Sequence, residues 1–252
     1  MAIVILVRHG RTTANASGLL AGRQAGVLLD ETGQVQAKEA GERLAAVPLA
    51  AVVTSPLERC VQTAAAIASV NVSAEVSGLE PQTDDALVEC DYGDWQGREI
   101  KALAKEKLWK VVQAQPSAVE FPGGETMPQM QARAATAVRR HDARVEAEYG
   151  VHAVWVAVSH GDPIKSVLAD ALGLHLDLFQ RINVDPGSIS IVRYTASRPY
   201  VLAVNTHAGD LSWLKPPPRK GRRKTSGKAT GKAGPEVDAP VGGGAGPASA
   251  GD

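Results

Sequence analysis

Two histidines of this sequence stand next to residues that suit the binding of an anion. His9 lies between Arg8 and Gly10, and His160 is followed by Gly161. Guanidinium groups match the oxygens of a phosphate group, and nearby cations disfavour protonation of a histidine, which leaves a ring nitrogen able to attack phosphorus. A glycine after each histidine would let backbone N–H groups approach the phosphate. The residue types therefore predict a phosphate site with a histidine nucleophile.

Each of these short motifs follows an apolar run that is typical of a buried strand. Strand patterns alternate with helical patterns along the chain, which predicts an α/β fold: a three-layer sandwich with a mostly parallel sheet, helices on both faces and an antiparallel edge strand. The predicted strands are residues 3–7, 51–54, 86–90, 153–158, 188–194 and 200–205, and the predicted helices are residues 33–46, 56–68, 125–149 and 163–172.

The predicted sheet indicates where the motifs meet. In open α/β sheets, ligands bind in the crevice beyond the carboxyl ends of the strands. Arg8 and His9 follow the first predicted strand, and Arg59 follows the second. His160 follows the strand at residues 153–158. These side chains are therefore expected to converge, with cationic groups supplying the charge that Mg²⁺ supplies in other phosphoryl-transfer sites.

Four blocks of the sequence, in this order, resemble the histidine phosphatase superfamily, the group that contains cofactor-dependent phosphoglycerate mutases and fructose-bisphosphatase-type phosphatases. The blocks are LVRHGRTTAN (residues 6–15), SPLERCVQTA (55–64), VECDYGDWQG (88–97) and VSHGDPIK (158–165). The resemblance spans residues 3–206. It implies an enzyme that acts on a small phosphorylated substrate. We expect this enzyme to use no metal and no cofactor, because cationic side chains can neutralise the phosphate.

The resemblance also implies roles for individual residues. His9 matches the histidine that is phosphorylated during turnover. Arg8, Arg59 and His160 match the residues that hold the phosphoryl oxygens, and Asn15 matches an asparagine near the same pocket. Further contacts with the substrate are expected from Gly22, Arg23 and Gly161.

Glu89 matches the acidic residue of the family, which protonates the leaving oxygen and later activates water. In the mutases of the family this block typically continues Glu-Arg-His-Tyr-Gly, whereas here Cys90 follows Glu89. The missing basic residue is one that would contact phosphoglycerate. The Tyr-Gly-Asp-Trp continuation and the segment EFPGGETMPQ at residues 120–129 resemble the phosphatase branch, so a phosphomonoesterase is favoured over a phosphomutase on a small sugar or acid phosphate.

Two other interpretations compete with this one. The side chains of His9, His160, Glu89, Asp91 and Asp162 could be drawn as a two-metal hydrolase site, but the neighbouring arginines would repel a cation. A phosphate-sensing or scaffold protein without turnover is the second alternative. It is disfavoured because the full expected set of site residues is present.

The charge of the chain is divided unevenly along its length. Among 252 residues there are 27 basic and 27 acidic side chains, but residues 215–252 hold eight basic and three acidic ones together with many glycines and prolines and no aromatic residue. Such a composition cannot bury enough apolar surface to fold. We therefore predict a catalytic domain at residues 1–214 and a disordered basic tail at residues 215–252. Without aromatic residues for base stacking, the tail is not expected to bind nucleic acid sequence-specifically.

The number of cysteines and the short apolar runs predict a cytoplasmic protein. Two cysteines, Cys60 and Cys90, cannot build a disulfide framework. The apolar run at residues 2–7 is far shorter than the roughly 20 residues of a membrane-spanning helix, so no membrane association is expected. The resemblance is compatible with a homodimer.

Overall fold

The computed structural model describes residues 2–70 and 79–207, and within them six strands form one sheet in the order β3-β2-β4-β1-β5-β6. Strands β1 to β4 run parallel, β5 is antiparallel to β1, and β6 is antiparallel to β5. The strands are β1 (Ile3–Arg8), β2 (Leu49–Thr54), β3 (Gln82–Thr83), β4 (Val154–Ser159), β5 (Ile189–Arg193) and β6 (Tyr200–Thr206). The predicted antiparallel edge is therefore the β5–β6 pair.

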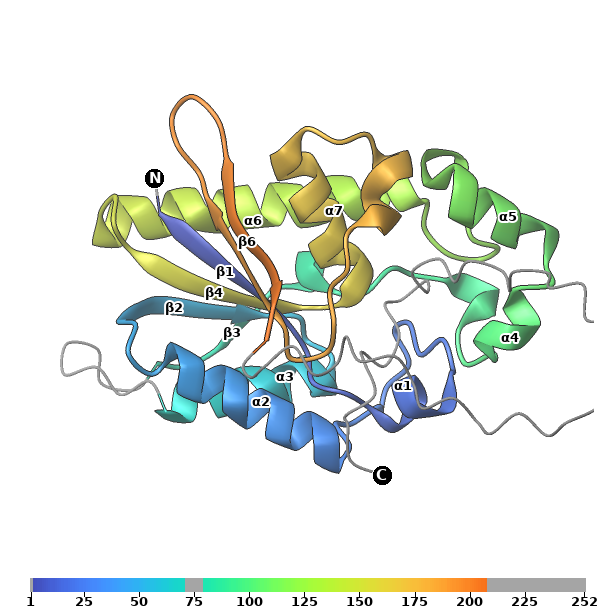
Figure 1. The fold of residues 1–252 in the computed structure, drawn as a ribbon, viewed down its shortest axis with the longest axis horizontal. Helices are drawn as coiled ribbons and strands as arrows, with labels where there is room; N and C mark the ends of the chain where they lie inside the picture. Colours follow the sequence, from blue (N-terminus) through green and yellow to red (C-terminus); the bar gives the residue numbers. More distant parts are fainter. Residues whose placement is uncertain (1, 71–78, 208–252) are drawn as a thin grey trace, which may run out of the picture.

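Helices cover both faces of this sheet (Figure 1). Helices α2 (Glu31–Leu44) and α3 (Glu58–Val70) pack on one face, and α6 (Met127–Tyr149) and α7 (Gly161–Leu172) pack on the other. Side chains alternate along β1, so that Val4 and Leu6 enter the core under α6 and α7 while Ile5 and Val7 enter the core under α2 and α3. The predicted three-layer sandwich is confirmed.

The predicted strand at residues 86–90 is wrong. The structure has a short 3-10 helix there, Asp85–Leu87, and the third strand is β3, which pairs with Val53 and Thr54. The side chain of Asp84 accepts a hydrogen bond from the Ala86 N–H at 2.9 Å and begins the turn. The backbone carbonyls that follow bond to an arginine side chain of α6 instead of to a strand.

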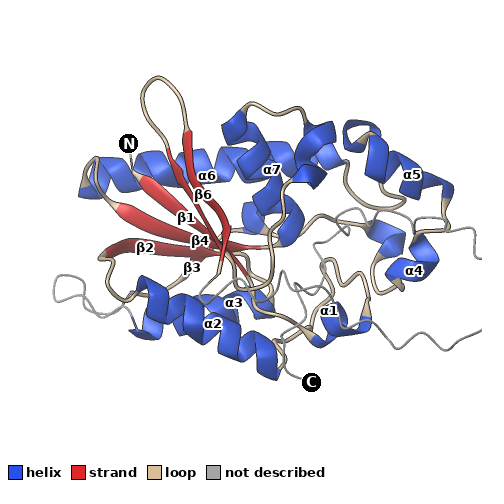
Figure 2. Cartoon of the chain, viewed as in Figure 1, coloured by secondary structure: helices blue, strands red, loops and turns tan. Residues whose placement is uncertain are grey.

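Several short elements that the sequence did not predict lie beyond the carboxyl ends of β1 and β4 (Figure 2). They are α1 (Thr13–Ser17), α4 (Ile100–Leu103), α5 (Lys107–Ala114) and the 3-10 helices Gly93–Trp95, Pro116–Ala118 and Leu176–Arg181. These elements border the end of the sheet where the site residues were expected.

The predicted domain boundary at residue 214 and the basic tail lie outside the described residues. Of the helices that the structure describes, none has the length and apolar character needed to cross a membrane.

Candidate active site

The ends of the parallel strands bring the predicted site residues together. His9 directly follows β1, Arg59 lies in the first turn of α3 after β2, and His160 caps the N-terminus of α7 after β4. The rings of His9 and His160 meet edge to face, with centroids 5.1 Å apart. The five residues that were predicted to take part in catalysis are all buried: Arg8, His9, Arg59, Glu89 and His160. Glu89 is the most exposed of them, at only 4%. The charged groups therefore lie in a largely desolvated site.

The ring of His9 is held in an orientation that suits nucleophilic attack. Its Nδ1 lies 2.7 Å from the carbonyl oxygen of Gly10, and because a carbonyl can only accept, Nδ1 carries the proton. The lone pair is then on Nε2, which accepts a hydrogen bond from Nε of Arg59 at 3.3 Å. Burial and the charges of Arg59 and Arg8 hold the pKa of His9 well below its usual range. His9 is thus neutral at physiological pH.

The two arginines of the site are fixed by backbone carbonyls. Nη2 of Arg59 donates to the Gly22 carbonyl at 2.6 Å, and Nη1 of Arg8 donates to the Val184 carbonyl at 2.8 Å. Burial lowers the pKa of Arg8 to about 10, partly offset by Glu89 and other acids, so the guanidinium remains charged at neutral pH. Two buried guanidinium groups beside one cavity favour an anionic ligand, and a phosphate group is such a ligand.

His160 lies behind His9 in the same charged site. Its Nε2 is 2.8 Å from Oγ of Ser55 and 3.4 Å from Sγ of Cys60. Burial and the charge of Arg59 hold the pKa of His160 well below its usual range. Both histidines are therefore neutral, and the positive charge of the site resides on the arginines.

Glu89 is placed to exchange a proton near neutral pH. One carboxylate oxygen accepts the N–H of Cys90 at 2.9 Å. Burial raises the pKa of Glu89 to about 7, the negative charge of Asp162 adds to this effect, and Arg59 and Arg8 oppose it. A carboxyl group with such a pKa can serve as an acid in one step and as a base in the next.

Two arginines hold the segment that carries Glu89. Arg133 of α6 donates to the carbonyls of Val88 at 2.7 Å and Glu89 at 3.0 Å. Arg23 donates to the same Glu89 carbonyl at 2.9 Å. The carboxylate of Glu125 accepts from both arginines, at 2.6 Å and 2.8 Å. This arrangement replaces the hydrogen bonds that a strand would have supplied.

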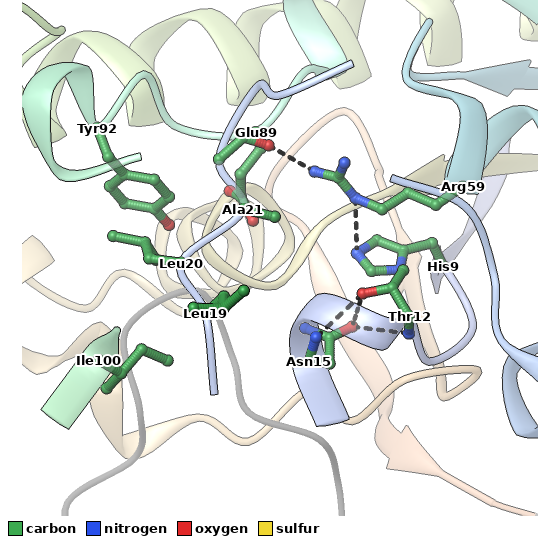
Figure 3. A pocket seen from close by; sticks show the side chains of 11 residues that line it. His9, Thr12, Asn15, Leu19, Leu20, Ala21, Arg59, Glu89, Tyr92 and Ile100 are labelled. Carbon is green, nitrogen blue, oxygen red and sulfur yellow. Dashed lines mark hydrogen bonds between the residues drawn. The ribbon is translucent and has the colours of Figure 1, made fainter. Parts of the chain in front are cut away.

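A cavity opens above His9 (Figure 3). Asn15 is fixed at its edge because its Oδ1 accepts from both N–H and Oγ of Thr12, at 3.1 Å and 2.9 Å, which leaves the amide NH₂ of Asn15 to donate. The lining residues are His9, Thr12, Asn15, Leu19, Leu20, Ala21, Gly22, Arg59, Glu89, Tyr92 and Ile100.

Other predicted residues lie behind or beside this cavity. Arg8, His160 and Gly161 are buried beneath it. Arg23 does not line the cavity, because its guanidinium is engaged by the Glu89 carbonyl and by Glu125. Its predicted contact with substrate remains a prediction.

Gly10 does not serve to bring a backbone N–H to the phosphate, although the sequence predicted that role. Its N–H donates to Oγ1 of Thr63 at 3.2 Å and does not face the cavity. A Cβ atom at Gly10 would lie 2.2 Å from the carbonyl oxygen of Gly33. Gly10 is therefore needed for the close approach of the β1–α1 connection to α2.

Tyr92, Asp162 and Lys165 form a buried cluster behind the cavity, and the sequence did not predict their mutual contacts. Oη of Tyr92 donates to Asp162 at 2.7 Å, and the carboxylate of Asp162 lies 3.8 Å from Nζ of Lys165. The sequence signal was present, since Asp162 directly follows the His-Gly pair. In the described ranges, no three His, Cys, Asp or Glu side chains are placed to hold a metal ion.

A histidine at a strand end, two fixed arginines and a carboxyl group across a cavity define a site for phosphoryl transfer. The model of the histidine phosphatase superfamily (branch 1) matches residues 4–207. The chain belongs to this superfamily.

Individual relatives agree with this assignment. Phosphoserine phosphatase 1 of Hydrogenobacter thermophilus is 31% identical over 219 residues, which are 84% of this chain and 96% of that protein. A protein of Yersinia enterocolitica named as a probable phosphoglycerate mutase is 31% identical over 218 residues, covering 85% and 95%. The solved mycobacterial glucosyl-3-phosphoglycerate phosphatase has the same fold, with a TM-score of 0.72 at 24% identity over 81% of this chain and 99% of that one.

Proposed function

We propose that this chain is a phosphomonoesterase that hydrolyses small phosphorylated metabolites through a phosphohistidine on His9. The observation that carries the proposal is the orientation of His9, whose Nδ1 is tied to the Gly10 carbonyl while Nε2 lies beside Arg59 at the cavity. Family membership and the relatives named as phosphatases support the same reaction.

The first half of the reaction forms the phosphoenzyme. Nε2 of His9 attacks phosphorus, the bond from phosphorus to the ester oxygen breaks, and Glu89 gives its proton to the departing alkoxide. The ring becomes positively charged as Nε2 is phosphorylated, and the Gly10 carbonyl, which accepts from Nδ1, stabilises that charge. Arg8 and Arg59 neutralise the phosphoryl oxygens.

The second half returns the enzyme to its starting state. Water attacks phosphorus, the Glu89 carboxylate takes a proton from that water, and the bond between phosphorus and Nε2 breaks with its electron pair returning to the ring. Inorganic phosphate leaves. Because the pKa of Glu89 is raised to about 7, both forms of the carboxyl group are accessible near neutral pH.

We further propose that no metal takes part, since Arg8 and Arg59 supply the positive charge that the transferring group needs. The decisive assay measures phosphate release from a panel of phosphorylated metabolites with excess chelator present. We expect full activity under chelation. Loss of activity that Mg²⁺, Mn²⁺ or Zn²⁺ restores would refute metal independence, and no hydrolysis of any phosphomonoester would refute the phosphatase and favour a phosphate-sensing protein.

Hydrolysis is favoured over mutase activity by the residue after Glu89. The side chain of Cys90 is buried and packs on Sδ of Met127 at 3.9 Å, so this position supplies no cation to a phosphoglycerate. The relative named as a probable phosphoglycerate mutase keeps the mutase as the alternative. Transfer of phosphate from phospho-His9 to an added alcohol acceptor would establish it.

The catalytic unit that we propose comprises residues 1–214, with the basic tail at residues 215–252 outside it. We place the enzyme in the cytoplasm, where Cys60 and Cys90, which are both buried free thiols, would remain reduced.

A further inference from the structure

The side of the cavity opposite His9 is apolar, and it is already formed without a substrate. Leu19, Leu20 and Ala21 come from the segment after α1, and Ile100 begins α4 (Figure 3). Backbone hydrogen bonds join the two segments: the Leu20 N–H donates to the Arg98 carbonyl at 3.0 Å, and the Ile100 N–H donates to the Gly18 carbonyl at 2.9 Å. The wall is thus built before any substrate arrives. We call these four residues the apolar wall.

The hydroxyl group of Tyr92, which also lines the cavity, is already engaged. The ring of Tyr92 lines the cavity beside the apolar wall, but its hydroxyl donates to the buried carboxylate of Asp162 at 2.7 Å. Tyr92 is fully buried. Its hydroxyl is therefore engaged within the protein and is not offered to the alcohol part of a substrate.

Positive charge is confined to the phosphate end of the cavity. Among its lining residues within the described chain, only Arg59 carries a positive charge, and it bonds to His9 and to the Gly22 carbonyl. Arg23 is engaged by Glu125, and Arg98 pairs with Glu106 at 2.5 Å. Neither side chain lines the cavity. A carboxylate on the alcohol part would lose water against the apolar wall without gaining a cationic partner, and it would lie near Glu89.

We propose that the apolar wall selects phosphomonoesters whose alcohol part is uncharged and apolar, such as an alkyl or aryl alcohol, over esters whose alcohol part carries a carboxylate. This inference rests on the proposed phosphatase function and names its substrate class. Phosphoserine and phosphoglycerate fall in the disfavoured class.

The test compares benzyl phosphate with 4-carboxybenzyl phosphate in the full chain, since these two esters differ in charge but little in the basicity of the leaving alkoxide. We expect kcat/KM for the uncharged ester to be at least roughly tenfold higher, with most of the difference in KM, because the wall acts in binding. Equal values, or a preference for the carboxylate, would overturn the inference. Hydrolysis of neither ester, or of any other phosphomonoester, would instead overturn the proposed phosphatase.

The second test of the proposal places a charge on the apolar wall. Ile100→Lys supplies a cation at the rim, and Ile100→Met is the matched uncharged control. We expect the lysine variant to reduce the preference for benzyl phosphate by roughly tenfold while the methionine variant retains it. The same reduction in both variants, or an unchanged preference in a folded lysine variant, would contradict the role of the wall. If the lysine variant does not fold, the ratio of kcat/KM for the two esters in the unmodified chain still tests the proposal.

Discussion

The floor and the wall of the cavity are built in different ways. The floor consists of His9 and Arg59, which line the cavity, and of Arg8 and His160 beneath them. All four are charged or polar and buried, and they lie at or shortly after the ends of parallel strands. The apolar wall comes from short segments that bond to each other instead of to the sheet. The sheet therefore positions the floor, while the connections between elements position the wall. On our two proposals, the floor carries the reaction and the wall selects the substrate.

The largest expected effect lies on the floor. His9→Ala should reduce turnover by roughly 10⁴-fold or more, because no other side chain can replace the nucleophile. Steady-state phosphate release gives the rate, and a thermal melt checks the fold. His152→Ala, which removes an exposed histidine, is the matched control and should leave both values unchanged. Appreciable turnover by His9→Ala would contradict the assignment.

Glu89 lies between the floor and the apolar wall, and we propose that it protonates the leaving group. The effect of replacing Glu89 should therefore depend on the leaving group. Glu89→Gln should slow phosphoenzyme formation from an alkyl phosphate by roughly 10²- to 10⁴-fold, because a poor leaving group needs the proton. An aryl phosphate needs little protonation, and with it phosphoenzyme should accumulate in a burst, since hydrolysis still lacks its base. Single-turnover kinetics measure both. Equal losses for the two substrates would mean that Glu89 only positions other groups.

Arg133 tests whether the segment of Glu89 must be held in place. Arg133→Met removes donors to the carbonyls of Val88 and Glu89 and should lower kcat for alkyl phosphates by roughly 10- to 100-fold, with a smaller loss for aryl phosphates. Arg139→Met, on the same helix, removes only a surface pair with Asp170 and is the control. A uniform loss for both substrate types would indicate a merely structural role.

The pH profile tests the electrostatic setting of Glu89. Its raised pKa keeps the acid form up to about pH 7, so kcat/KM for an alkyl phosphate should fall as pH rises through that value. The charge of Asp162 contributes to the raised pKa, hence Asp162→Asn should move the falling limb to lower pH. Asp94→Asn, an exposed acid, should leave the limb in place. A limb that moves to higher pH in Asp162→Asn would refute this explanation.

The smallest effect is expected from the tail. Removal of residues 215–252 should leave the melting temperature and the activity toward small phosphomonoesters nearly unchanged, because a segment of this composition offers little apolar surface for burial. A large drop in either quantity would show that the tail belongs to the catalytic unit.

The convergence of the floor residues could be predicted because it follows from short, local sequence patterns. The apolar runs before Arg8 and His160 identify buried strands, and the ends of parallel strands must meet. The segment around Glu89 was misread as a strand because its conformation depends on Arg133, which is more than 40 residues away. The apolar wall could not be predicted, since Leu19 and Ile100 carry no chemical signal and meet only through long-range backbone hydrogen bonds.

The central claim is that phosphate passes through His9. Rapid quenching of the enzyme with a labelled aryl phosphate, with Glu89→Gln used to slow breakdown of the intermediate, should trap an acid-labile, base-stable phosphoenzyme whose label maps to His9 by mass spectrometry. The label should form fast enough to account for turnover. Turnover without such a label, or a label on any other residue, would contradict the account.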